Sequence, residues 1–110
     1  MYFITTLFLE RIEQNSTEET PIFNYNEKRS RCIGYYNNYD SALEVVQNNL
    51  CDIYEWGHYN FVVIEEVKEG VYQYDDHPIW FAVSFNAKNN TYKVKKTKNP
   101  FPNICGFGIG

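Results

Sequence analysis

The chain has 110 residues, of which 44% are hydrophobic and 22% are charged, as in an ordinary globular protein. This length fits one domain over residues 1–110, since no linker or internal repeat divides the sequence. The formal net charge of -4 argues against general binding to the phosphate backbone of DNA or RNA.

The first predicted element is a strand over residues 2–11, YFITTLFLER. Its apolar residues fall on both faces, which is typical of a central strand or of one that a partner subunit also covers. The segment lacks the basic start and cleavage site of a signal peptide, and its apolar run is too short to cross a membrane. Residues 14–21, QNSTEETP, are expected to form a polar loop, and Phe23 and Tyr25 then begin a short extended segment.

A second strand is predicted over residues 31–36, RCIGYY, followed by a helix over about residues 40–54. Strict alternation would put Arg31, Ile33 and Tyr35 on one face of the strand, and Cys32, Gly34 and Tyr36 on the other. The residues NNYDS offer helix caps, and Ser41 with Glu44 would form a capping box. One apolar stripe at helical spacing is formed by Ala42, Leu43, Val46, Leu50 and Ile53.

Three more strands are predicted over residues 60–67, 79–85 and 91–97, the last two joined by a hairpin loop. The basic run Lys93, Lys95, Lys96 and Lys98 is interpreted as the solvated face of an edge strand. We therefore predict an α+β fold, in which a mainly antiparallel sheet of about five strands packs with one principal helix.

The three cysteines Cys32, Cys51 and Cys105 are odd in number and form no CxxC pair. This pattern favours reduced thiols in the cytoplasm over disulfides or a zinc site. Because Cys32 and Cys51 lie within apolar patterns, we expect both in the core.

Signals for catalysis are weak, and we expect no catalytic residue, metal or cofactor. His58 and His77 belong to no HxH or HExxH motif, and no cysteine has a well-placed histidine. The tail GFGIG lacks the helix and the Lys-Ser/Thr pair of a phosphate loop. It is best interpreted as an edge strand, with presentation of Phe107 to a ligand as the alternative.

Aromatic residues make up 18% of the chain, which suits interfaces and ligand pockets, although a compositional bias explains the excess equally well. Arginine is scarce, so Arg29 and Arg31 draw attention as phosphate ligands. For Arg31 a phosphate contact and a surface ion pair are equally open, whereas the ion pair is favoured for Arg29.

A polar and aromatic group follows the predicted helix and comprises Glu55, Trp56, His58 and Tyr59. Carboxylates accept hydrogen bonds from ribose hydroxyls, and aromatic rings stack on bases. The competing interpretation is that Trp56 and Tyr59 attach the helix end to the sheet.

The order RCIGYY, a helix ending in CDIYE, then YNFVVIEE, EGVYQ, an aromatic WF strand and GFGIG resembles small proteins of phages and Firmicutes prophages. Within that group the chain most resembles the Thoeris anti-defence sponges, which sequester cyclic ADP-ribose signals. The resemblance covers residues 31–110. It implies a non-enzymatic homo-oligomer, dimer or higher, in the host cytoplasm, which holds a cyclised ADP-ribose isomer or another cyclic nucleotide intact. No nucleic acid polymer and no membrane is expected as a partner.

Residue chemistry can be fitted to that implied ligand. Arg31 would contact the pyrophosphate, and Arg29 and Tyr35 are also expected to bind the ligand. The riboses would be reached by Glu55, His58 and Tyr59, and the adenine would be held by Trp80, Phe81 or Phe107. The small number of basic residues departs from this picture, unless a second subunit supplies another arginine. The alternative function is a small acidic inhibitor that binds a host defence enzyme through Tyr and Trp hot spots.

Overall fold

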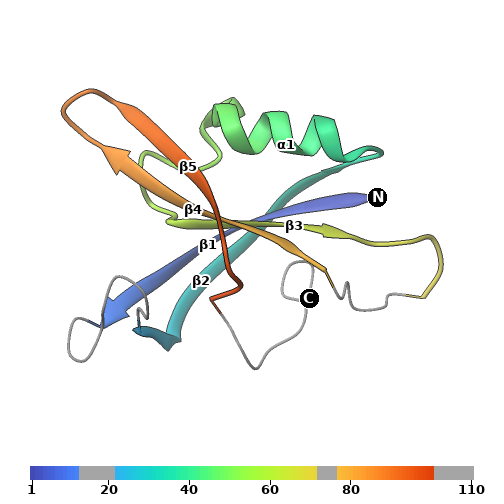
Figure 1. Cartoon of the computed structure of the whole chain (residues 1–110), viewed down its shortest axis with the longest axis horizontal. Coiled ribbons are helices and arrows are strands. Elements are labelled where there is room, and N and C mark those ends of the chain that lie inside the picture. The colour runs from blue at the N-terminus through green and yellow to red at the C-terminus, as the bar shows by residue number, and fades with distance from the viewer. Residues whose placement is uncertain (13–21, 72–76, 101–110) are drawn as a thin grey trace.

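In a computed structural model of the chain, the described residues are 1–12, 22–71 and 77–100, and for residues 25–28 the description covers the backbone alone. The expected loop at residues 14–21, the GFGIG tail with Phe107, and Cys105 lie outside this part. The described chain forms a five-stranded sheet with one α-helix on it, which confirms the predicted α+β class (Figure 1).

The strands are β1 (Tyr2–Ile12), β2 (Ile22–Tyr36), β3 (Phe61–Glu66), β4 (Ile79–Asn86) and β5 (Thr91–Thr97). They lie in the order β2-β1-β3-β4-β5, and each described pairing is antiparallel. β1 is therefore internal, as its two apolar faces predicted. β2 begins earlier than expected, and it forms one edge of the sheet.

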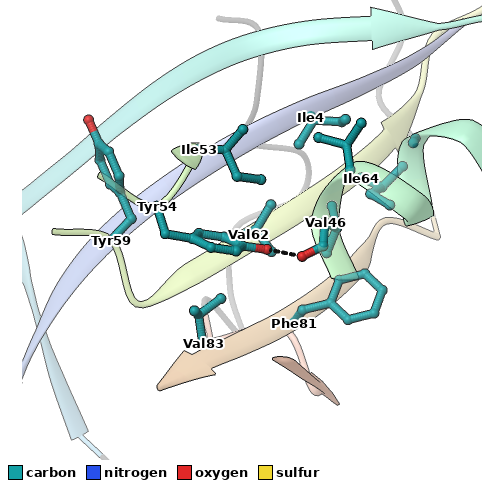
Figure 2. Packing of buried hydrophobic residues seen from close by; sticks show 11 residues of the cluster. Ile4, Val46, Ile53, Tyr54, Tyr59, Val62, Ile64, Phe81 and Val83 are labelled. Atoms are coloured by element: carbon teal, nitrogen blue, oxygen red, sulfur yellow. Dashed lines mark hydrogen bonds between the residues drawn. The ribbon is translucent and has the colours of Figure 1, made fainter. Parts of the chain in front are cut away.

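The helix α1 (Tyr39–Asn48) covers one face of the sheet, called here the helix face (Figure 1). Beneath it, Ala42 and Val46 pack in one cluster with residues of β1, β3 and β4 such as Ile4, Val62 and Phe81 (Figure 2). The opposite face carries a second cluster, formed by Leu7, Leu9, Phe61, Val63 and Trp80. The central strands bury apolar side chains on both faces, which explains their nearly continuous apolar sequences.

The helix begins at a different cap and ends earlier than predicted. The Asn38 side-chain oxygen accepts a 2.8 Å hydrogen bond from the Ser41 backbone N–H, so Asn38 is the cap and the expected Ser41–Glu44 capping box is wrong. At the other end Asn49 adopts the left-handed conformation with φ of 48°, and a 3-10 turn, η1 (Leu50–Asp52), follows. Leu50 consequently leaves the apolar stripe and is 41% exposed.

The cysteine prediction was also wrong, because Cys32 and Cys51 are both exposed. Cys32 lies on an edge strand, and Cys51 lies in the 3-10 turn with φ of 56°, where the helical pattern has already ended. Apolar neighbours in the sequence were therefore not a sign that these two cysteines are buried.

A bulge in β2 changes which residues share a face. Ile4 pairs with Gly34 and Thr5 pairs with Cys32, so Ile33 is an extra residue in β2. β1 remains regular against β3 at these positions, which places the irregularity in β2. The predicted alternation across residues 31–36 therefore fails, because Arg31 and Tyr35 lie on opposite faces.

β4 and β5 follow their predicted patterns closely. Phe81 and Val83 lie on the helix face, whereas Trp80 lies on the other. Lys93 and Lys95 pair with Ser84 and Ala82, are exposed, and occupy an edge strand as expected. Neither α1 nor another helix in the described ranges has the length and apolar character that crossing a membrane requires.

Candidate functional site

The two arginines Arg29 and Arg31 project from β2 on the helix face. They pair with Phe8 and Thr6 of β1, and Phe8 packs against the cluster beneath the helix. Residues two apart in a strand share a face and are spaced by about 7 Å. Because β2 is an edge strand here, both arginines are exposed, and they present two guanidinium groups side by side.

The loop between η1 and β3 is fixed by buried anchors. Its residue Tyr54 is fully buried, and the backbone N–H of His58 donates a 2.9 Å hydrogen bond to the Tyr54 carbonyl. Asn60 then ties the loop to β1, since its side chain accepts from the Leu9 N–H at 2.9 Å and donates to the Leu9 carbonyl at 2.8 Å. The loop therefore approaches β1 and β2 in a defined position.

Two loop side chains meet the two arginines. Arg29 Nη1 lies 2.8 Å from His58 Nε2, and Arg31 Nη1 lies 3.6 Å from Glu55 Oε2. A guanidinium has donors only, so His58 Nε2 must accept the hydrogen bond from Arg29. Arg29 also lies over the Phe8 ring, with Cζ 4.8 Å from the ring centroid.

Tyr59 completes the group. Its ring packs at 5.3 Å from His58, edge to face, and its side chain is hydrogen bonded to Glu55. Burial and this contact with Glu55 raise the pKa of the Tyr59 hydroxyl, while Arg31 and Arg29 lower it by a smaller amount. Arg29, Arg31, Glu55, His58 and Tyr59 are named here the arginine cluster.

The arginine cluster holds two guanidinium groups against one carboxylate, and so it carries a local excess of positive charge on an acidic chain. The Arg31–Glu55 contact is too long for a hydrogen bond and is exposed, so it stabilises the fold by less than about 1 kcal/mol. An incoming anion can therefore replace the carboxylate at little cost.

The other expected contacts lie elsewhere. Tyr35 is 58% exposed, but the bulge turns it to the opposite face, where its ring lies 5.3 Å from that of Phe3. Trp80 is 3% exposed on that same face, and Phe81 is 5% exposed in the cluster under α1. Neither ring presents a face to a ligand, and Phe107 lies outside the described residues.

An aromatic row lies at the β4 end of the loop. Trp56 contacts Phe85 at 5.4 Å between ring centroids, Phe85 contacts Tyr92 at 4.8 Å, and Tyr92 contacts Tyr54 at 5.5 Å. Trp56 is 67% exposed, whereas Tyr59 is buried. Both rings therefore attach the loop to the sheet, Tyr59 as a buried side chain and Trp56 as an exposed one that contacts Phe85 of β4. Phe85 and Tyr92 could have been found from the sequence, since paired strands place them opposite each other.

Asp52 holds the backbone of this loop. Its Oδ1 accepts from the Asn49 side chain at 3.1 Å, from the Trp56 backbone N–H at 3.2 Å, and from the Tyr92 hydroxyl at 3.3 Å. The bonds from Asn49 and Trp56 lower the pKa of the Asp52 carboxyl more than its slight desolvation raises it. Glu55 and Trp56 have φ of 46° and 55°, values that L-residues adopt at a cost.

His77 lies apart from the arginine cluster. It lines an open hollow of about 220 Å³ with Tyr2, Tyr39, Ile64, Glu66 and Ile79. Over residues 1–12, 22–71 and 77–100, no three His, Cys, Asp or Glu side chains are grouped as metal ligands. Comparison of the chain with protein-family models, with curated proteins and with solved structures finds no match.

Proposed function

We propose that the protein binds a small phosphate-bearing nucleotide at the arginine cluster and sequesters it without changing it chemically. The observation that supports this most is the pair of exposed guanidinium groups on one face of β2, next to a carboxylate and an imidazole. Guanidinium groups bind phosphate oxygens bidentately, and two of them in register suit a ligand with two phosphates.

The remaining members of the arginine cluster suit the sugar of such a ligand. Once a phosphate has replaced Glu55 at Arg31, the carboxylate is free to accept hydrogen bonds from ribose hydroxyls. The Tyr59 hydroxyl lies beside it as a second polar group. The loop is held by Tyr54 and Asn60, so little conformational entropy is lost when the ligand binds.

The chemistry of His58 supports binding over catalysis. A general base needs a free lone pair that can reach a substrate proton. Nε2 of His58 already accepts a hydrogen bond from Arg29, so this lone pair is not free to take a proton from a substrate. Sequestration requires neither an acid nor a base, and it is consistent with this arrangement.

The resemblance to the Thoeris anti-defence sponges extends the proposal to a particular ligand class and setting. The ligand would be a cyclised ADP-ribose isomer, held in the host cytoplasm so that the immune effector stays inactive. A homo-oligomer would bring further arginines to each ligand, which answers the low arginine content of one chain.

The test is calorimetric titration of the purified protein with cyclic ADP-ribose isomers and with cyclic di- and trinucleotides. We expect one of them to bind tightly and to be recovered intact after denaturation. Arg31→Ala and Arg29→Ala should each weaken binding by roughly 10- to 100-fold, the range for a charged hydrogen bond. Arg11→Ala is the matched control, because Arg11 pairs with Phe23 at the far end of β1. Failure of the whole panel to bind, or recovery of cleaved ligand, would contradict sequestration.

The alternative function, inhibition of a host defence enzyme by direct binding, is favoured by one observation. Tyr35 and Tyr36 are both exposed near the end of an edge strand, one on each face of the sheet, and tyrosine is frequent at hot spots of protein interfaces. A stoichiometric complex with such an enzyme, abolished by Tyr35→Ala but unaffected by Arg31→Ala, would support this alternative.

A further inference from the structure

The most exposed aromatic side chain in the described part of the chain is Trp56, and it lies on an uncommon backbone conformation that specific contacts stabilise. The indole is 67% exposed although tryptophan is a large apolar residue. Its backbone has φ of 55°, a conformation that is uncommon for residues with bulky side chains. Glycine or asparagine would fit this position with less strain, so stability does not account for the tryptophan.

The strained conformation is held from two sides. Asp52 accepts the hydrogen bond from the Trp56 backbone N–H, and Phe85 packs against the indole. Gly57, at φ of 83°, lets the chain pass Phe85 closely, because a Cβ there would lie 2.6 Å from the Phe85 ring. The indole is thus presented in a fixed place, and little rotamer freedom remains to be lost when something binds it.

We infer that the exposed indole of Trp56 is the surface on which the base of the bound nucleotide stacks. This inference rests on the proposed function and names the base contact for which Trp80 and Phe81 are too deeply buried. Trp56 follows Glu55 directly, and Glu55 touches Arg31, so the ring and the phosphate ligands belong to one continuous surface. Every base has a flat π-face that can stack on an indole.

The arrangement also constrains the shape of the ligand. Glu55 contacts Arg31 of β2, whereas Trp56 contacts Phe85 of β4, and two strands lie between β2 and β4. With about 4.8 Å between neighbouring strands, the two anchoring strands are about 14 Å apart. The Arg31 side chain crosses part of this gap to reach Glu55, so a ligand that touches both the guanidinium groups and the indole must place its phosphates on the β2 side of Glu55 and its base at Trp56.

Two ligands separate what the guanidinium groups and the indole each contribute to binding. Cyclic ADP-ribose carries both pyrophosphate and base, and inorganic pyrophosphate carries the first alone. Trp56→Ala should weaken binding of cyclic ADP-ribose by roughly 5- to 100-fold, the range for loss of one stacking ring. It should leave binding of pyrophosphate unchanged, and Arg31→Ala should weaken both. Trp56→Phe, which keeps a ring, should restore most of the affinity.

Fluorescence gives a second readout in which Trp56 itself is kept. The sequence has two tryptophans, and Trp80 is buried, so Trp80→Phe leaves Trp56 as the single emitter. Cyclic ADP-ribose should quench this emission and pyrophosphate should not. Unchanged affinity of Trp56→Ala for cyclic ADP-ribose, or binding of cyclic ADP-ribose without quenching, would overturn the inference and leave the proposed function standing. If the unaltered protein binds neither compound nor any cyclic di- or trinucleotide of the panel, both the inference and the proposed function fail.

Discussion

The hydroxyl of Tyr54 donates a 2.6 Å hydrogen bond to the backbone carbonyl of Val46, near the end of α1 (Figure 2). The last carbonyls of a helix have no partner within the helix, so this buried bond satisfies one of them from outside. It joins the end of α1 to the start of the loop that carries Glu55, Trp56 and His58. The helix and the candidate site therefore share one buried attachment point.

Removal of that hydroxyl should destabilise the fold. Tyr54→Phe leaves the Val46 carbonyl buried without this donor, and we expect the free energy of unfolding to fall by about 1 to 3 kcal/mol. Urea denaturation measures the change. The control is Tyr35→Phe, whose exposed ring should tolerate the change within about 0.5 kcal/mol. Equal stability of the two variants would refute the role given to Tyr54.

Stability should also fall in alkaline solution. Burial raises the pKa of the Tyr54 hydroxyl above the ordinary tyrosine value of 10.0, and it is also the largest cause of the raised pKa values of Tyr59 and Tyr92. The folded state thus holds these protons more tightly than the unfolded state, so their contribution is fully present below pH 10 and is lost as the pH rises further. Urea titrations between pH 8 and 11 should show the decline, and Tyr54→Phe should make it less steep. A profile that stays flat would contradict these shifts.

Gly57→Ala should be costly for two separable reasons. The new methyl group would meet the Phe85 ring at 2.6 Å, and φ of 83° is unfavourable for alanine. We expect a loss of about 2 to 4 kcal/mol in the free energy of unfolding. Gly70→Ala is the matched control, since Gly70 has φ of 114° but no atom within 4 Å of an added Cβ. A smaller loss in the control isolates the collision with Phe85, whereas equal losses would show that backbone strain alone matters.

Asp52→Asn should loosen the loop that presents Trp56. The substitution keeps the shape of the side chain but removes the charge that strengthens its bonds to Asn49, the Trp56 N–H and Tyr92. We expect a loss of about 1 kcal/mol at pH 7 and faster hydrogen exchange at the Trp56 amide. Glu69→Gln, in an exposed turn, serves as the control for removal of one negative charge.

The contribution of the Asp52 carboxylate to stability should also depend on pH. Because the pKa of Asp52 is lowered in the folded state, its contribution is present above the ordinary aspartate pKa and is lost as the pH falls through the folded value. The difference in stability between the native protein and Asp52→Asn should therefore shrink below about pH 4. A difference that persists at low pH would exclude the charge as its cause.

Most of the fold could be predicted from the sequence because the apolar periodicity is unambiguous. β4 and β5 alternate cleanly, and β1 has apolar residues on both faces, so class and strand positions follow directly. The ends of α1 were harder to predict from the sequence. Asn49 ends the helix by turning into the left-handed conformation, and the apolar stripe continues past it to Leu50 and Ile53, which hides the boundary.

The candidate site was predictable only in part. Glu55, His58 and Tyr59 are close in the sequence, and the antiparallel sheet brings them to Arg29 and Arg31. Tyr35 was misplaced because strict alternation took no account of a bulge, which the neighbouring Gly34 could have indicated. The exposure of Trp56 depends on positive φ values in a loop of ordinary composition, and a pattern of apolar residues in the sequence does not predict such values.

The extra residue at Ile33 separates the part of β2 that carries Tyr35 and Tyr36 from the part that carries Arg29 and Arg31. Deleting it would leave Gly34 opposite Ile4 and Cys32 opposite Thr5, so neither stretch would need to slide against β1. The tyrosines at one end of β2 and the guanidinium pair at the other therefore each keep their own register against β1.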